Sequence, residues 1–261
     1  MLDNFEQIVD NAEFVKQIAS LIISADEELI ARTNLKIVVV GTPSNIKQMI
    51  EKVSNATTIS NRFVEIPEVA RLEFVEARHI MSQGFETHLR STILIDKNAL
   101  YRDIAYKTDR IAQHVQELCL KIAYSASEQG NKINQQIVEK AEREWLDETL
   151  ASDLAIVEDL MNSQETKVGR KNQVMYCLGL IEKEDFKHND IEKLVRKTFP
   201  VPDGVNLNVS QILSGFAQAE NPLIRKTGRP REYRFCSPKV KIVIRTNLRI
   251  STDGRVVKSH N

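Results

Sequence analysis

The sequence has 261 residues, of which 42% are hydrophobic and 28% are charged, as is typical of a folded globular protein. It has no run of eighteen apolar residues, which argues against a membrane span, and its acidic start MLDNFEQIVD lacks the apolar core of a signal peptide. We therefore expect a cytoplasmic protein with no membrane partner. The cysteines are widely separated and fit no metal site, so we expect reduced core thiols at Cys119, Cys177 and Cys236.

The formal net charge is zero, but the charge is distributed unevenly along the chain. From Pro222 onward, eleven Lys or Arg residues stand against only Glu232 and Asp253, a net charge of +9. The preceding residues contain 25 basic and 34 acidic side chains, a net charge of −9. A basic module attached to an acidic one favours nucleic acid as the partner of the basic part. A merely solvated basic surface is the alternative.

The first block, residues 1–68, has an α/β pattern. It predicts a helix near Ala12–Ser24, a strand at 36–40, a helix at 45–53 and a short strand around 63–66. The strand KIVVV is continuously apolar, which is typical of a parallel strand buried on both faces. Ligand sites lie at the carboxyl ends of such strands, so Thr42, Ser44 and Asn45 are candidate site residues. The alternative is an ordinary polar turn in which Asn45 starts the next helix.

The second block, residues 69–165, is almost entirely helical in pattern. Residues 108–125 place apolar side chains on one face, and Gly130 with Asn131 is expected to end that helix. A further helix is predicted at 134–150, with Trp145 in the core. Asp96 precedes KNALYRDIA and is predicted to cap that helix rather than to act in catalysis.

The third block, residues 166–261, predicts three helices followed by a hairpin. The helical patterns lie at 171–181, at 190–198 and from about 209 to 219, and the hairpin is NPLIRKTGRPREYRF. Three helices followed by a basic hairpin is the order of a winged helix, in which the hairpin reaches the DNA backbone. Phosphate contact is the natural role of the hairpin cations Arg225, Lys226, Arg229 and Arg231. Winged helices also serve as protein-docking modules, which is the alternative.

The stretch MLDNFEQIVD resembles the end of a Walker B strand, although the usual adjacent Asp-Glu pair is here Asp-Asn-Phe-Glu. In this it resembles the AAA+ P-loop ATPases of the initiator-like and transposition-associated branch. The resemblance implies that Asp3 binds Mg²⁺ and that Glu6 polarises the attacking water. An acidic first helical turn is the alternative interpretation of this stretch.

Other motifs of the same family follow in the expected order. The stretch KIVVVGTPSN resembles the sensor 1 strand, which implies that Thr42, or else Asn45, lies beside the γ-phosphate. The stretch TTISNRFVEIP resembles the segment with the arginine finger, which implies that Arg62 reaches a neighbouring subunit's nucleotide; a surface salt bridge is the alternative. The stretch AYKTDRIAQHVQELCLKIAYSASEQGNKINQQIVEKA resembles the helical lid and places Arg110 near sensor 2. REYRFCSPKV resembles the end of an appended winged helix.

The resemblance implies a mostly α protein in three parts. They are a partial α/β AAA+ core with a parallel sheet (1–68), an all-α lid (69–165) and a winged-helix domain (166–261). No GxxxxGK[ST] motif occurs in the sequence, so we predict no ATPase activity from this chain alone. ATP and Mg²⁺ would bind only if a Walker A half were supplied, and we expect a fragment, a split-gene product or an internal-start form.

Two functions are compatible with this sequence. One is the carboxyl-terminal portion of a DNA-associated AAA+ ATPase that couples nucleotide state to assembly on DNA. Its partners would be DNA and either further copies of itself or a chain that supplies the missing half. The other is a non-enzymatic DNA-binding or adaptor protein with an inactive AAA+ scaffold.

Overall fold

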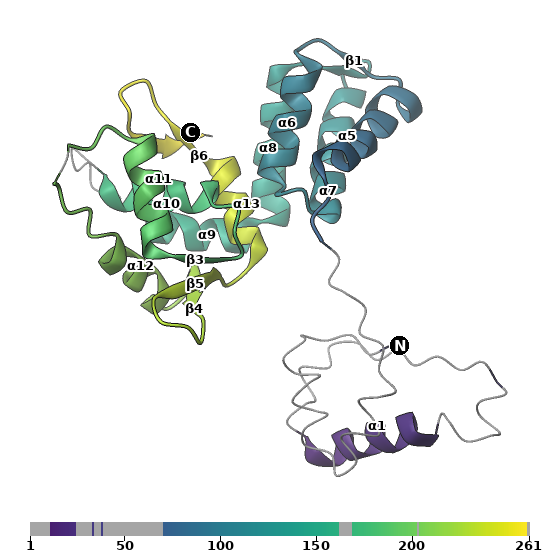
Figure 1. Cartoon of the computed structure of the whole chain (residues 1–261). Coiled ribbons are helices and arrows are strands. Elements are labelled where there is room, and N and C mark those ends of the chain that lie inside the picture. Colours follow the sequence, from purple (N-terminus) through teal and green to yellow (C-terminus); the bar gives the residue numbers. More distant parts are fainter. Residues whose placement is uncertain are drawn as a thin grey trace. The chain divides into compact units, whose positions relative to one another are not determined.

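The computed structural model describes residues 11–24, 33, 38, 70–161, 169–202 and 204–259. The chain divides into two units, Met1–Val69 and Ala70–Asn261, each considered by itself (Figure 1). In the first unit, helix α1 spans Ala12–Ser24, as predicted, and buries Val15, Ile18, Ala19 and Ile22 at helical spacing. Of the other elements predicted for residues 1–68, only Val38 falls within the described residues. The parallel core sheet therefore stays a prediction.

The first part of the second unit is helical. It contains α5 (Phe74–Ser82), the π-helix η2 (Gln83–His88), α6 (Lys97–Lys107), α7 (Ala112–Ser127), α8 (Gln135–Thr149) and α9 (Ala151–Leu160). Helices α7 and α8 pack against each other, and each buries the apolar face predicted for it, with Leu118, Ile122 and Trp145 fully buried. Gly130 and Asn131 have positive φ, and the N–H of Asn131 donates to the carbonyl of Ala126, which ends α7 as predicted.

Polar side chains cap two of these helices. Asp96 accepts a hydrogen bond of 2.6 Å from the N–H of Ala99 at the start of α6. Asn134 accepts one of 3.0 Å from the N–H of Ile137 at the start of α8. Each cap satisfies a helical N–H that otherwise lacks a partner, which is worth about 1 kcal/mol. The structural role predicted for Asp96 is therefore confirmed.

The same segment also contains a sheet, which corrects the prediction of an all-α lid. Strands β1 (Thr92–Ile93) and β2 (Lys132–Ile133) pair in parallel, with Thr92 opposite Lys132. A parallel pair needs a long crossover, and here α6 and α7 form it. Two-residue strands are too short to produce an alternating pattern that could be recognised in the sequence.

The second part of this unit combines helices with an antiparallel sheet. In chain order it contains α10 (Arg170–Leu180), β3 (Asp185–Lys187), α11 (His188–Thr198), α12 (Val209–Gln218), β4 (Ile224–Lys226) and β5 (Glu232–Phe235). The three predicted helices and the predicted hairpin are present. The hairpin gains a third strand, β3, which was not predicted, and the strand order is β3-β5-β4. Aromatic contacts of Phe186 with Tyr233 and Phe235 pack the inner face of the sheet.

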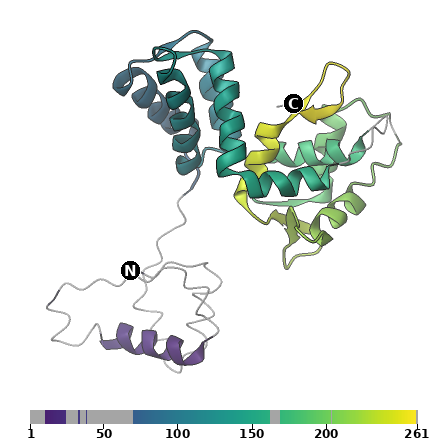
Figure 2. The ribbon, with the colours of Figure 1, turned by 180° about the vertical axis from the view of Figure 1, so that it is seen from behind.

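Helix α13 (Pro238–Asn247) joins the two parts of the second unit. It contacts α6, α8 and α9 on one side and α10 on the other, and it runs between the two sets of helices (Figure 2). Every residue from Val240 to Asn247 is buried. The antiparallel pair β6 (Leu248–Ile250) and β7 (Val256–Lys258) follows. Among the described helices, none is both long and apolar enough to cross a membrane.

Helices α10 and α13 pack very closely at Gly179. A Cβ atom added to Gly179 would lie 2.8 Å from Cγ2 of Ile244 and 3.4 Å from Cγ of Arg245. Contacts shorter than 3 Å require the neighbouring atoms to move, so this position needs the absence of a side chain. Glycine at residue 179 therefore sets the distance between the two helices.

The cysteines differ in burial. Cys177 is buried and Cys119 is partly buried, and burial raises the pKa of each thiol to about 12. Cys236, which follows β5, is exposed. The prediction of core thiols is therefore wrong for Cys236.

Candidate nucleic-acid interface

The hairpin of β4 and β5 is closed by a turn at residues 227–231 that is stabilised from within. The N–H of Thr227 donates to the carbonyl of Glu232 (3.0 Å), and its hydroxyl donates to the Glu232 carboxylate (2.8 Å). Arg231 has a φ of 57°, a left-handed conformation that is costly for a residue with a Cβ atom. These hydrogen bonds hold the turn in one shape, and the shape determines where its arginines point.

A row of charged side chains crosses the outer face of the sheet. Asp185 on β3 lies opposite Arg234 on β5, which lies opposite Arg225 on β4. The Arg234 guanidinium binds Asp185 through two hydrogen bonds of 2.6 and 2.9 Å. Arg234, together with Arg229 and Arg225, lowers the pKa of the Asp185 carboxyl. The Arg234 guanidinium is therefore bound to Asp185 within the protein. Arg225 adds a second positive charge near the same carboxylate, which Arg234 already neutralises.

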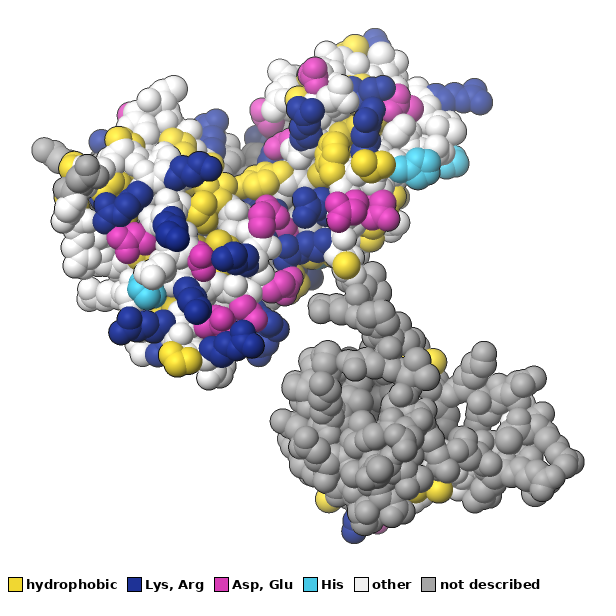
Figure 3. Space-filling model, viewed as in Figure 1, with side chains coloured by type: hydrophobic (Ala, Val, Ile, Leu, Met, Phe, Trp, Pro, Cys, Tyr) yellow, Lys and Arg dark blue, Asp and Glu magenta, His cyan; other side chains and the backbone are white. Residues whose placement is uncertain are grey.

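The four predicted phosphate-contacting residues lie together on this hairpin. Arg225, Lys226, Arg229 and Arg231 are all exposed. The side chain of Arg229 is 79% exposed, and its ion pair with Glu232 is long, at 3.9 Å. Lys and Arg side chains gather over this end of the unit in the space-filling view (Figure 3). The hairpin therefore presents several cations that can reach a polyanion without unfolding any element.

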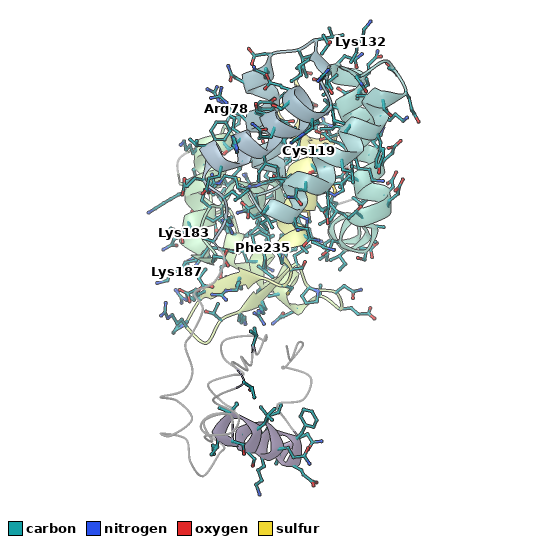
Figure 4. The ribbon with its side chains drawn as sticks, turned by 90° about the vertical axis from the view of Figure 1, so that its right-hand side faces the viewer. Arg78, Cys119, Lys132, Lys183, Lys187 and Phe235 are labelled. Atoms are coloured by element: carbon teal, nitrogen blue, oxygen red, sulfur yellow. The ribbon has the colours of Figure 1, made fainter. Side chains whose placement is uncertain are left out.

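Strand β3 adds cations that the sequence analysis missed. Lys187 is exposed and lies opposite Glu232 in the sheet, and Lys183 precedes the same strand. The two lysines lie on the same side of the unit in the stick view (Figure 4). These lysines stand some forty residues before the hairpin, so only the strand pairing brings them to it. Lys183 is paired with Asp190 at 3.1 Å, which leaves Lys187 as the more available of the two.

Helix α12 precedes the hairpin and differs from it in charge. It buries Val209, Leu213 and Phe216 and has no Lys or Arg. Its exposed residues include Ser210, Gln211 and Gln218. A polar cleft of about 570 Å³ lies at its start, lined by His188, Glu192, Asn206, Asn208, Val209, Ser210, Gln211 and Ser214. This face can make hydrogen bonds but contributes no positive charge.

Arg110, the predicted sensor 2 residue, lies in an unusual turn between α6 and α7. Asp109 and Arg110 both adopt left-handed backbone conformations, with φ of 51° and 57°. The N–H of Arg110 donates to the carbonyl of Ala105 (3.1 Å), and its carbonyl accepts from the N–H of Leu72 (2.9 Å). Two consecutive left-handed residues with side chains are strained and persist only where the surroundings hold them.

A buried ionic cluster holds this turn. The Asp109 carboxylate lies 3.0 Å from Nζ of Lys241, 2.9 Å from Nη1 of Arg245 and 3.1 Å from Nε of Arg71. Arg245 also donates to the carbonyls of Gly179 (2.5 Å) and Tyr106 (2.7 Å). The side chains of Asp109, Lys241 and Arg245 are at most 3% exposed. Sequence reasoning missed this cluster because Lys241 and Arg245 lie more than 130 residues after Asp109 in the chain.

The cluster has an excess of positive charge. Burial, followed by the neighbouring Arg245, lowers the pKa of Lys241 to about 8, and Asp109 offsets only part of this effect. Arg245 is partly compensated by Glu182 at 3.1 Å and by the ring of Tyr106, whose centroid is 4.4 Å away. Asp109 is therefore tightly held, whereas Lys241 has an unfavourable environment for its charge.

A small pocket of about 130 Å³ borders the same turn. Its lining is Phe74, Arg102, Ala105, Tyr106, Asp109, Arg110, Glu182 and Arg245. The Nε of Arg110 is buried without a hydrogen-bond partner, and its Nη2 lies 3.8 Å from a Glu182 oxygen. The Nε of Arg110 can donate to an acceptor in this pocket, whereas the carboxylates of Asp109 and Glu182 in the same lining disfavour an anion.

The remaining predicted site residues, Asp3, Glu6, Thr42, Asn45 and Arg62, lie outside the described residues. Their assignments as residues that bind ATP or Mg²⁺ therefore stay predictions. Within the described residues, no group of three or more His, Cys, Asp or Glu side chains is placed to hold a metal ion.

Comparisons of the chain with protein-family models, curated proteins and solved structures found no match. The case for function therefore depends on the geometry above and on the motifs of the sequence itself.

Proposed function

We propose that this chain binds DNA through the hairpin of β4 and β5, as the winged-helix part of an AAA+ protein. The observation that carries the proposal is the group of four exposed cations, Arg225, Lys226, Arg229 and Arg231, on a structured hairpin. Its context supports the proposal, because a sheet of order β3-β5-β4 with helices α10, α11 and α12 follows the chain order of a winged helix.

The two neighbouring elements would have different roles on DNA. The hairpin and Lys187 would contact phosphates, which gives affinity without reading sequence. Helix α12 would enter the major groove with uncharged groups such as Gln211 and Ser210, which can hydrogen-bond to base edges. We therefore expect binding that depends strongly on salt and only modestly on sequence.

The proposal includes a nucleotide-dependent role for the remaining segments. ATP and Mg²⁺ would bind at Asp3, at Thr42 or Asn45, and at Arg110, with Arg62 acting across a subunit boundary in an oligomer. The sequence has no Walker A motif, so the phosphate-binding loop would have to come from a further part of a longer protein or from a partner chain. In this proposal, nucleotide state controls how subunits assemble on DNA, and this chain alone does not hydrolyse ATP.

One observation favours a second candidate function. The lack of Lys and Arg on α12 is unusual for a helix that must approach a polyanion, and it suits a protein-docking surface. In that case the chain would be a non-enzymatic adaptor, and the polar cleft at the start of α12 would receive a protein segment.

A salt series on the full chain tests the proposal. Binding to a fluorescent duplex should weaken steeply with salt, and Arg229→Ala and Arg231→Ala should each reduce the slope of log K against log salt by about 1. Lys140→Ala, which removes an exposed cation from α8, is the control and should leave the slope unchanged. Absence of binding at about 50 mM salt would contradict DNA binding and leave the adaptor function.

A further inference from the structure

One helix links the basic hairpin to the strained turn at residues 108–111. We propose that Lys241 and Arg245 of α13 are positioning residues that hold Arg110 at its pocket, so that DNA bound to the hairpin stabilises this turn. The inference rests on the proposed DNA binding by the hairpin. It adds a physical route between the hairpin and a pocket elsewhere in the same unit.

The first step of this route is the connection between β5 and α13. Only Cys236 and Ser237 separate the two elements, and neither is loose. The N–H of Cys236 donates to the carbonyl of Leu223 (3.0 Å), which continues the pairing of the hairpin. The Ser237 hydroxyl accepts from the N–H of Lys239 (3.1 Å) and caps α13. A displacement of the hairpin is therefore transmitted to α13 rather than absorbed by a flexible linker.

The second step is the contact between α13 and Asp109. Lys241 and Arg245 are one helical turn apart and both reach Oδ1 of Asp109, at 3.0 and 2.9 Å. Arg245 also holds the carbonyl of Tyr106, which belongs to the last turn of α6. Hydrogen bonds weaken steeply with distance and angle. A small shift of α13 therefore weakens the hydrogen bonds from this helix to Asp109 and to Tyr106.

The third step is the backbone continuity between Asp109 and Arg110. Both residues are left-handed, and this conformation places Arg110 beside the pocket with its Nε buried and unpaired. A turn of this kind needs external support, because each residue relaxes toward the right-handed region when released. Fixing Asp109 therefore fixes the position of Arg110, and releasing it frees Arg110 to leave the pocket.

Hydrogen exchange on the full chain, with and without a saturating DNA duplex, tests the inference. The amides of Asp109, Arg110 and Ile111 are all hydrogen-bonded within the turn and report its opening. DNA should slow their exchange by about fivefold or more, the lower end of typical coupling between sites. The amide of Asn131, hydrogen-bonded in the turn after α7, is the matched control and should change by less than about twofold.

Two variants separate coupling from a merely structural role. Asp109→Asn preserves the shape of the side chain and removes its charge, and Lys241→Met serves if the first variant does not fold. Each should retain DNA binding within about threefold while losing the DNA-dependent slowing at the turn. If DNA binds but the turn is unaffected, or if both variants keep the slowing, the inference is wrong and the proposed function stands. If the wild-type chain binds no DNA, the proposed function fails first, and the inference fails with it.

Discussion

The basic residues near the carboxyl end form two groups with opposite environments. The side chain of Arg229 in the hairpin is 79% exposed, whereas Lys241 and Arg245 in α13 are 3% and 2% exposed. The first group is available to a partner, whereas the second forms ion pairs with Asp109 within the protein. A net charge counted from sequence therefore overestimates the charge that DNA can meet.

The two groups also differ in what their ion pairs contribute to stability. Exposed pairs gain little because water screens them, typically less than about 1 kcal/mol. Removing one partner of a buried pair leaves an uncompensated charge, which costs about 3–5 kcal/mol. Removing the carboxylate should therefore destabilise the protein far more at Asp109 than at Asp185.

The largest effect is expected from removing the buried carboxylate. Asp109→Ala leaves Lys241 buried without its anion and Arg245 with only Glu182, and it should lower the free energy of unfolding by about 3–5 kcal/mol. Urea denaturation followed by circular dichroism measures this change. Asp253→Ala, which breaks the exposed pair with Arg255, is the control and should leave the midpoint nearly unchanged. A loss below about 1 kcal/mol at Asp109 would show that its cations do not depend on it.

The next effect concerns the pH dependence of stability. The pKa of Lys241 is about 8 in the folded protein, below its ordinary value of 10.5, so the unfolded chain binds more protons between these values. The contribution of Lys241 to the free energy of unfolding therefore rises with pH across this window, by about 2–3 kcal/mol. Urea midpoints measured at pH 7.5 and 10 should show this rise in the wild type. Lys241→Met should remove that part of the rise, and an identical pH profile in the variant would contradict the assignment.

A smaller effect is expected where α10 meets α13. Gly179→Ala introduces a Cβ atom 2.8 Å from Ile244, and it should destabilise the protein by about 1–2 kcal/mol in thermal or urea unfolding. Gly215→Ala in α12 is the matched control, because no atom lies within 4 Å of its added Cβ. Alanine has a higher helix propensity than glycine, so this control should gain about 0.5–1 kcal/mol. If both variants change the stability by the same amount, α10 and α13 do not approach each other as closely as described.

The smallest effect is expected at the sheet surface. Asp185→Ala removes the partner of Arg234 in a partly exposed pair, and it should cost only about 0.5–1 kcal/mol in urea unfolding. The same variant removes a negative charge beside Arg234 and Arg225, so DNA affinity at low salt should increase. Unchanged or weaker DNA binding would indicate that this face does not meet DNA.

The features that could be predicted from the sequence are those set by nearby residues. The cap Asp96, the end of α7 and the buried face with Trp145 all follow from signals within a few positions. The basic hairpin could be predicted for the same reason, because its turn residues and its arginines are adjacent.

The features that could not be predicted depend on distant contacts. The stretch VKIVIRTN is rich in β-branched residues, which favour strands, yet it forms α13. Burial on all sides overrides this weak local preference. The cluster around Asp109 was missed for a related reason, because Lys241 lies 132 residues further along the chain.

The central position of α13 has a consequence for synthesis of the protein on the ribosome. Helices α6 and α8 emerge long before α13, which fills the space beside them. Until then, Asp109 lacks Lys241 and Arg245, and the apolar surface that later contacts α13 stays open to water. Such incomplete intermediates are prone to aggregation. The nascent helices therefore carry an aggregation-prone surface until α13 has been translated.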